Sequence, residues 1–240
     1  MIKKIKDIDI NYIQYGNSKG KDIVLLHGWG QNIEMMRPLG DNLEDFRITI
    51  LDFPGFGESS LPSSALTVYD YTDILEELLS ELDVKNPIVM GHSFGGRVAI
   101  VYASRNKVEK LVLFGAPCVR ENRKSVKESV LKGIKKLPGM NTLGEYMKKH
   151  IGSEDYRNAS PVMRETLVNT VNEDLSECAK KITCPTLLIW GTNDAAAPIE
   201  DAKKLENLLV DGALIEIPGC THYAYLEALP QVINILNNFL

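Results

Sequence analysis

The stretch Gly91-His92-Ser93-Phe94-Gly95 places one serine between two glycines, each two residues away. A serine hydroxyl is a weak nucleophile that must stand clear of the backbone and next to a base. A sharp turn from a strand into a helix presents the hydroxyl in this way, but it forces an unfavourable backbone angle on the serine and crowds its neighbours. Glycines at the two flanking positions relieve that crowding. The residue types and their spacing therefore predict that Ser93 is a nucleophile.

Apolar runs bounded by turn residues surround this motif and recur along the chain. The run 87–91 ends two residues before Ser93, and 95–104 has a helical pattern. Continuous apolar runs of this length are typical of strands buried on both faces. Because helical patterns lie between most of them, the sequence predicts an α/β fold with a mostly parallel sheet flanked by helices. The predicted strands are two short ones within 2–16 and six more within 22–28, 46–55, 87–91, 108–115, 185–191 and 213–219.

The segment from 119 to about 181 interrupts this alternation, because it has a helical, charged composition and no buried-strand run. Ligands of open α/β sheets bind at the carboxyl ends of the strands, so we interpret the insertion as a lid over that edge. The predicted division is a core of residues 1–117 and 182–240 and a small all-helical lid, 118–181, inserted after the sixth strand. Helix caps are predicted at Thr67, before the helical pattern that runs to Leu82, and within the insertion at Asn141, at Ser160 before Pro161, and at Asp174 with Glu177 three residues on.

The first half of this insertion differs from the rest of the chain in charge. Residues 119–150 carry nine basic side chains and three acidic ones, whereas the whole chain has a formal net charge of −5. A solvated face of amphipathic helices explains such a pattern. Attraction of an anionic substrate or an acidic acyl carrier also explains it, and the sequence leaves both interpretations open.

Composition excludes several other classes of protein. The 240 residues, 44% of them hydrophobic and 25% charged, are enough for one domain with a full hydrophobic core. The mild acidity argues against a dedicated nucleic-acid binder. The start, MIKKIKDIDI, lacks the apolar core of a signal peptide, and no run approaches the ~18 apolar residues of a membrane span, so we expect a cytoplasmic protein. Reduced thiols without metal spacing are expected at Cys118, Cys178, Cys184 and Cys220.

Four motifs together resemble the α/β-hydrolase family, and the resemblance covers nearly the whole chain. They are LLHGWG, similar to the family's oxyanion turn; LDFPGFGES, similar to its D-x-x-G-x-G-x-S segment; GHSFGG, its nucleophile elbow; and LLIWGTNDAAAP, similar to its acid loop. Each motif alone is weak evidence, whereas the four in this order are specific. The resemblance implies the α/β-hydrolase fold.

The resemblance also implies a base and an orienting acid, in the chain order serine, acid, histidine. His27 and His92 lie inside the oxyanion turn and the elbow, where the family keeps histidines in positioning roles, and His150 lies in the charged insertion. His222, after the last predicted strand, is therefore the expected general base. Asp194, in the turn after LLIWG, is the expected acid that fixes the tautomer of the imidazole.

An oxyanion formed by attack of Ser93 needs preorganised donors. The backbone N–H of Phe94 is one expected donor, and the resemblance implies the N–H of Trp29 as the other. The side chains of Trp29 and Phe94 are expected to line the substrate pocket, with core packing as the alternative. Asp52 is expected to be structural. The chain departs from many relatives by having Thr221 where a glycine often precedes the histidine.

A serine nucleophile implies hydrolysis of a carboxylic ester or thioester of a small or medium acyl group, without cofactor or metal. HGWGQN with a small lid resembles the esterases that cleave pimeloyl-carrier methyl ester, which the basic insertion would suit. Carbon–carbon bond hydrolases of oxo-dienoate substrates and menaquinone-pathway lyases share the triad, and Gly95-Gly96-Arg97 is similar to the latter. A ligand receptor on the same fold is a further alternative. Substrate choice depends on the lid and the pocket, so the fold does not rank these activities.

Overall fold

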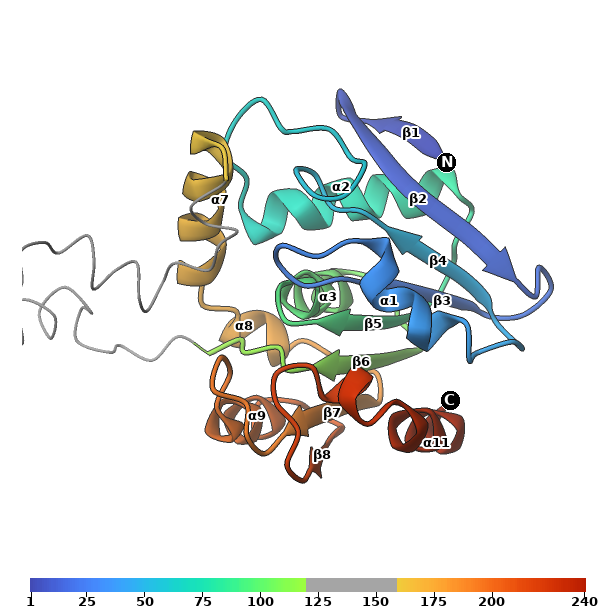
Figure 1. Cartoon of the computed structure of the whole chain (residues 1–240), viewed down its shortest axis with the longest axis vertical. Coiled ribbons are helices and arrows are strands. Elements are labelled where there is room, and N and C mark those ends of the chain that lie inside the picture. The colour runs from blue at the N-terminus through green and yellow to red at the C-terminus, as the bar shows by residue number, and fades with distance from the viewer. Residues whose placement is uncertain (120–158) are drawn as a thin grey trace, which may run out of the picture.

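The computed structural model of the chain describes residues 1–119 and 159–240 (Figure 1). The predicted cap at Asn141, His150 and the nine basic residues counted within 119–150 lie outside the described residues. The two ends of the insertion, up to residue 119 and from residue 159, are described.

One sheet of eight strands is formed by the described residues, in the order β1-β2-β4-β3-β5-β6-β7-β8. The pairs β1–β2 and β2–β4 are antiparallel, and every other neighbouring pair is parallel. Each predicted strand is present, and the mostly parallel sheet is confirmed. The strands are β1 Ile2–Ile5, β2 Ile8–Gly16, β3 Asp22–Leu26, β4 Arg47–Leu51, β5 Ile88–His92, β6 Lys110–Phe114, β7 Thr186–Gly191 and β8 Gly212–Ile217.

Helices cover both faces of the sheet (Figure 1). One face packs against α2, α3, α8 and α9, and the other against α1, α10 and α11. The described helices are α1 Ile33–Gly40, α2 Val68–Glu81, α3 Phe94–Arg105, α7 Pro161–Asn172, α8 Ser176–Ala179, α9 Ile199–Glu206, α10 Ala224–Glu227 and α11 Leu229–Phe239. Both described helices of the insertion, α7 and α8, lie between β6 and β7, so the insertion follows the sixth strand as predicted.

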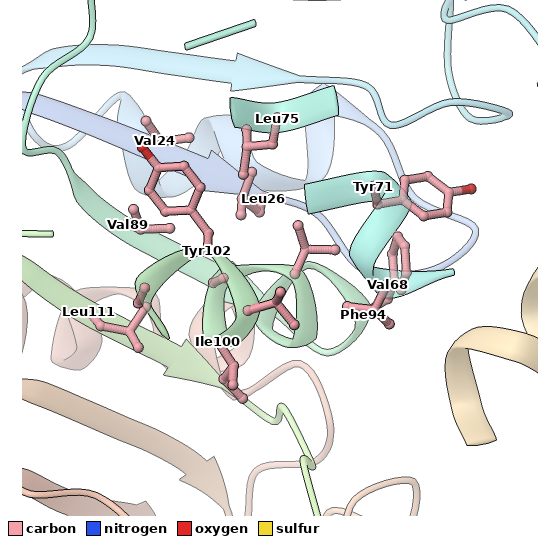
Figure 2. Packing of buried hydrophobic residues seen from close by; sticks show 14 of the residues in the cluster. Val24, Leu26, Val68, Tyr71, Leu75, Val89, Phe94, Ile100, Tyr102 and Leu111 are labelled. Atoms are coloured by element: carbon pink, nitrogen blue, oxygen red, sulfur yellow. The ribbon is translucent and has the colours of Figure 1, made fainter. Parts of the chain in front are cut away.

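The two hydrophobic cores follow the alternation of side chains along each strand. In β3, Val24 and Leu26 join the core under α2 and α3, whereas Ile23 and Leu25 join the core on the opposite face. Figure 2 shows Val24 and Leu26 facing the helices that carry Leu75 and Phe94. Burial on both faces explains why the central strands have continuous apolar sequences.

Strand β8 differs from its prediction, because it is an edge strand. The apolar run 213–219 predicts a strand buried on both faces. In the structure β8 pairs only with β7, Ala213 and Glu216 are exposed, and Ile217 is its one buried residue. The apolar run alone does not reveal that the strand lacks a second neighbour.

Two predicted helix caps are confirmed and one is displaced. Thr67 and Asp70 form a capping box at the start of α2. Ser160 caps α7, with Pro161 in its first turn. Asp174 accepts from the Ser176 N–H at 2.9 Å, but it lies one residue before the N-cap of α8.

Candidate active site

Ser93 lies at a sharp turn between β5 and α3. Its φ of 49° and ψ of −111° are values that residues with a side chain rarely adopt. A Cβ on Gly91 would lie 2.6 Å from the backbone oxygen of Gly95, and a Cβ on Gly95 would lie 2.4 Å from the backbone oxygen of Leu26. The predicted strand–turn–helix geometry and the need for both glycines are confirmed.

The backbone of Ser93 is held by the neighbouring strand and by the helix that it starts. Its N–H donates to the carbonyl oxygen of Phe114 at 2.9 Å, and its own carbonyl accepts from the Arg97 N–H at 3.1 Å. The residue is half-buried. Because it stands at the N-terminus of the 12-residue α3, the helix dipole favours negative charge that develops beside the hydroxyl.

Asp194 and His222 are joined by a hydrogen bond of 2.7 Å between Oδ2 and Nδ1. Asp194 lies in the turn after β7, and its Oδ1 accepts from the N–H groups of Ala196 and Ala197 at 2.9 and 2.8 Å. The carboxylate side chain is fully buried, whereas 18% of the His222 side chain is exposed. Since the carboxylate accepts from Nδ1–H, the lone pair of a neutral His222 lies on Nε2, as a general base requires.

The end of β6 brings this pair close to Ser93. Phe114, the last residue of β6, accepts from the Ser93 N–H, and Gly115 follows with a φ of +53°. A Cβ on Gly115 would lie 3.1 Å from His222 Nδ1 and 3.2 Å from Asp194 Oδ2. No hydrogen bond joins Ser93 to His222 in the described part of the chain; such contacts often tighten only in the substrate complex. The three predicted residues therefore converge at the carboxyl edge of the sheet.

The turn after β3 is fixed by buried polar contacts. His27 Nε2 accepts from the Phe53 N–H at 3.0 Å, and His27 Nδ1 donates to the Gly28 carbonyl at 2.7 Å. Burial lowers the pKa of His27 to about 4, so the ring is neutral near pH 7. Gln31 Oε1 accepts from the Gly28 N–H at 2.8 Å. These contacts set the backbone path into Trp29 and agree with the predicted positioning role of His27.

The backbone N–H groups of Trp29 and Phe94 are free to act as donors. Neither makes a hydrogen bond to another residue within 1–119 or 159–240. The Trp29 ring contacts the rings of Phe56 and Phe94 edge-on, with centroids 4.8 and 5.4 Å apart. Phe94 is only 4% exposed, whereas Trp29 is half-buried. The geometry thus favours pocket lining by the Trp29 side chain over the Phe94 side chain, and both assignments remain predictions.

Asp52 has the structural role that the sequence predicted. Its Oδ1 accepts from the Ile33 N–H at 2.8 Å, and its Oδ2 accepts from Asn11 Nδ2 and the Glu58 N–H at 2.8 and 2.9 Å. The carboxylate therefore joins the start of α1 to β2 and to the loop after β4. These three bonds occupy both carboxylate oxygens of Asp52, and none of them involves Asp194 or His222.

Arg97 has a role that the sequence analysis did not predict. Its guanidinium donates to the backbone carbonyl of Pro117, just before the insertion, and to that of Glu173, near the end of the insertion between α7 and α8. Glu173 in turn accepts from the Val68 N–H at 2.9 Å. Arg97 therefore ties both ends of the insertion to the helix that carries Ser93. The Gly95-Gly96-Arg97 motif marks Arg97 in the sequence, but it does not reveal that the guanidinium binds backbone carbonyls.

Three further features concern the cysteines, groups of metal-ligating side chains and the length of the apolar helices. All four cysteines are free, with Cys118 buried and the others half-buried. Within residues 1–119 and 159–240, no group of three or more His, Cys, Asp or Glu side chains could hold a metal ion. In the same residues no helix is both long and apolar enough to cross a membrane.

The sheet topology and the strained serine at its carboxyl edge define an α/β enzyme with a hydrolase-type elbow. The family model for the alpha/beta hydrolase fold matches residues 22–143. The chain belongs to this family and is an α/β-fold hydrolase.

Individual relatives cover most of the chain at modest identity. The AB hydrolase superfamily protein YisY of Bacillus subtilis is 26% identical, over 92% of this chain and 91% of that protein. The pimeloyl-[acyl-carrier protein] methyl ester esterase of Nitrosospira multiformis is 27% identical, over 87% of this chain and 90% of that protein. The solved esterase of Exiguobacterium antarcticum superimposes with a TM-score of 0.79 at 20% identity, over 99% of this chain and 98% of that one.

Two buried neutral histidines predict loss of stability in acid. Burial lowers the pKa of His27 to about 4 and that of His92 to about 3, whereas the unfolded chain takes up these protons near pH 6.5. The unfolded state therefore binds more protons below pH 6.5, and stability falls as the pH drops toward 3–4. For each histidine, the free energy of unfolding should be about 2 kcal/mol lower at pH 5 than at pH 7.

Urea denaturation at pH 7 and pH 5 measures this effect. His27→Gln is the matched variant, because glutamine keeps an acceptor for the Phe53 N–H but does not titrate. Its stability should fall less between the two pH values than that of the wild type. An equal loss in both proteins would contradict the burial of a neutral His27.

Proposed function

We propose that the protein hydrolyses carboxylic esters or thioesters of small or medium acyl groups through an acyl-enzyme on Ser93. The observation that carries the proposal is the 2.7 Å hydrogen bond between Asp194 and His222 at the sheet edge that also holds the strained Ser93. This arrangement has the parts of a nucleophile, a base and an orienting acid.

In the first half of the reaction, Ser93 Oγ attacks the carbonyl carbon of the substrate. His222 Nε2 takes the hydroxyl proton, and the backbone N–H groups of Trp29 and Phe94 stabilise the oxyanion. When the tetrahedral intermediate collapses, the bond to the leaving alcohol or thiol breaks and His222 returns the proton to it. Asp194 stabilises the imidazolium throughout.

In the second half, water replaces the alcohol or thiol. His222 takes a proton from water, the hydroxide attacks the acyl carbon, and a second oxyanion forms in the same site. The bond to Ser93 Oγ then breaks, Oγ regains its proton from His222, and the carboxylic acid leaves. No cofactor is consumed in either half.

We further propose that residues 1–117 and 182–240 form the catalytic core and that residues 118–181 form a lid that selects the substrate. Contacts between α7 and the core support it. Thr166 Oγ1 accepts from the Leu66 N–H at 3.1 Å, and a Cβ on Gly55 would lie 2.4 Å from Met163 Sδ. In Figure 1, α7 lies beside the start of α2. The described end of the insertion therefore packs on loops that follow the carboxyl ends of the strands.

Hydrolysis of a p-nitrophenyl ester series, from acetate to a long acyl chain, tests the proposal. A rate that falls sharply with chain length would support a small-acyl esterase with a tight pocket. No turnover of any ester would contradict the proposal and favour a carbon–carbon bond hydrolase, a menaquinone-pathway-like lyase or a receptor.

An acyl-carrier ester is a narrower proposal for the substrate. It is supported by the nine basic residues within 119–150 and by the likeness to a pimeloyl-[acyl-carrier protein] methyl ester esterase. Reversing Lys132, Lys135 and Lys136 to glutamate should weaken turnover of an acyl-carrier ester far more than turnover of p-nitrophenyl acetate. Equal effects on both substrates would instead indicate a solvated face. These lysines lie outside the described residues.

A further inference from the structure

His92, the last residue of β5, makes an unusual contact between two loops. Its side chain is fully buried, and its Nε2 lies 2.9 Å from the backbone oxygen of His222, 130 residues further on. A carbonyl oxygen only accepts, so Nε2 carries the proton and donates it. Burial lowers the pKa of His92 to about 3, so near pH 7 the ring is neutral and has only this one proton to donate.

This bond links the main chains of two proposed catalytic residues by a short path. His92 is the chain neighbour of Ser93, and the acceptor is the carbonyl of His222 itself. The rings of His92 and His222 also pack together, with centroids 4.8 Å apart. Asp194 acts on a different part of the base, because it binds the imidazole at Nδ1. Asp194 therefore orients the ring, whereas His92 fixes the backbone from which the ring projects.

The other side of the His222 backbone is held as well. The Thr221 N–H donates to Glu227 Oε2 at 2.7 Å, and the Thr221 hydroxyl donates to the other carboxylate oxygen of Glu227. Glu227 is the last residue of the short α10. With the Thr221 side held by Glu227, loss of the His92 bond would release the carbonyl side of His222.

We propose that His92 is a positioning residue that fixes the main chain of His222 relative to Ser93. This inference rests on the proposed function of the Ser93–His222–Asp194 site. His92 acts through His222, because its single N–H donates to the His222 carbonyl 2.9 Å away rather than to Ser93 Oγ.

A core-filling role is the competing explanation, because the His92 ring also packs on Tyr225, with centroids 4.8 Å apart. Two substitutions separate the explanations. His92→Phe keeps an aromatic ring but removes the donor, whereas His92→Gln has an amide N–H that reaches about as far as Nε2. If the donor matters, glutamine should restore what phenylalanine loses. If packing matters, phenylalanine should be the better replacement.

The experiment measures labelling of Ser93 by a fluorophosphonate probe, together with kcat and KM for p-nitrophenyl acetate. His92→Phe should lower the labelling rate and kcat by about 10- to 100-fold with little change in KM, since misplacement of a reacting group by about 1 Å costs about 10²-fold. His92→Gln should retain most of the rate. In a His222→Ala background, His92→Phe should have no further effect on the slow residual labelling.

Each outcome decides between defined alternatives. An unchanged rate in His92→Phe, or an equal loss in the His222→Ala background, would overturn the positioning role while leaving the proposed function intact. A failure of wild-type Ser93 to react with the probe would overturn the proposed function itself. If His92→Phe does not fold, the comparison of His92→Gln with the wild type still decides the matter, because a loss of 10-fold or more in this folded variant would contradict the inference.

Discussion

Replacing Ser93 with alanine should lower kcat for p-nitrophenyl acetate by at least about 10³-fold, because no other group can form the acyl-enzyme. The fold should be retained. The Ser93 side chain makes no hydrogen bond to another described residue, and alanine meets the same backbone strain as serine. Initial rates and a urea denaturation curve for the variant and the wild type check both parts of the prediction.

Ser18→Ala is the matched control for this variant. Ser18 is exposed in the loop between β2 and β3, at the amino end of β3 and therefore at the opposite edge of the sheet from Ser93. The Ser18→Ala variant should hydrolyse the ester as fast as the wild type. Full activity in Ser93→Ala would contradict the assignment of the nucleophile.

Replacing Asp194 with asparagine should lower kcat by about 10⁴-fold, the effect of the same change in the serine protease triad. The physical reason lies in the turn after β7. The amide oxygen of an asparagine can still accept from the N–H groups of Ala196 and Ala197, as Asp194 Oδ1 does. The amide NH₂ then faces His222 Nδ1 as a donor. The imidazole proton is driven to Nε2, which can no longer accept a proton from Ser93.

Asp201→Asn is the matched control, because it makes the same change of side chain outside the proposed site. Asp201 lies in the first turn of α9 and pairs at 3.3 Å with Lys204. Its replacement should leave kcat unchanged. The rates of both variants should be measured beside their unfolding curves. Wild-type activity in a folded Asp194→Asn would remove Asp194 from the mechanism.

Much of this site could be predicted from the sequence because its residues sit in local patterns. The strained turn at Ser93 leaves no room for a Cβ at positions 91 and 95, so the glycines at these positions mark the turn in the sequence. The central strands are buried on both faces, so their apolar runs mark where the carboxyl edge must lie. Asp194 follows β7, which is buried on both faces, whereas His222 follows the edge strand β8, and the resemblance to a family supplied the roles of both residues.

Contacts between distant segments could not be predicted in this way. The bond from His92 to His222 joins residues 130 apart, and Arg97 reaches Glu173 over 76 residues. Neither partner is a side chain, so no pattern of residue types marks it. The edge position of β8 was missed for a related reason, because the number of neighbours of a strand depends on topology rather than on its own sequence.

The most direct test of the account is the mass of the enzyme quenched in acid during turnover of a p-nitrophenyl ester. We expect the mass to rise by one acyl group, located by peptide mapping on the fragment that contains Ser93, and no such adduct in Ser93→Ala. Turnover accompanied by an adduct on another residue, or sustained turnover by Ser93→Ala, would contradict an acyl-enzyme on Ser93.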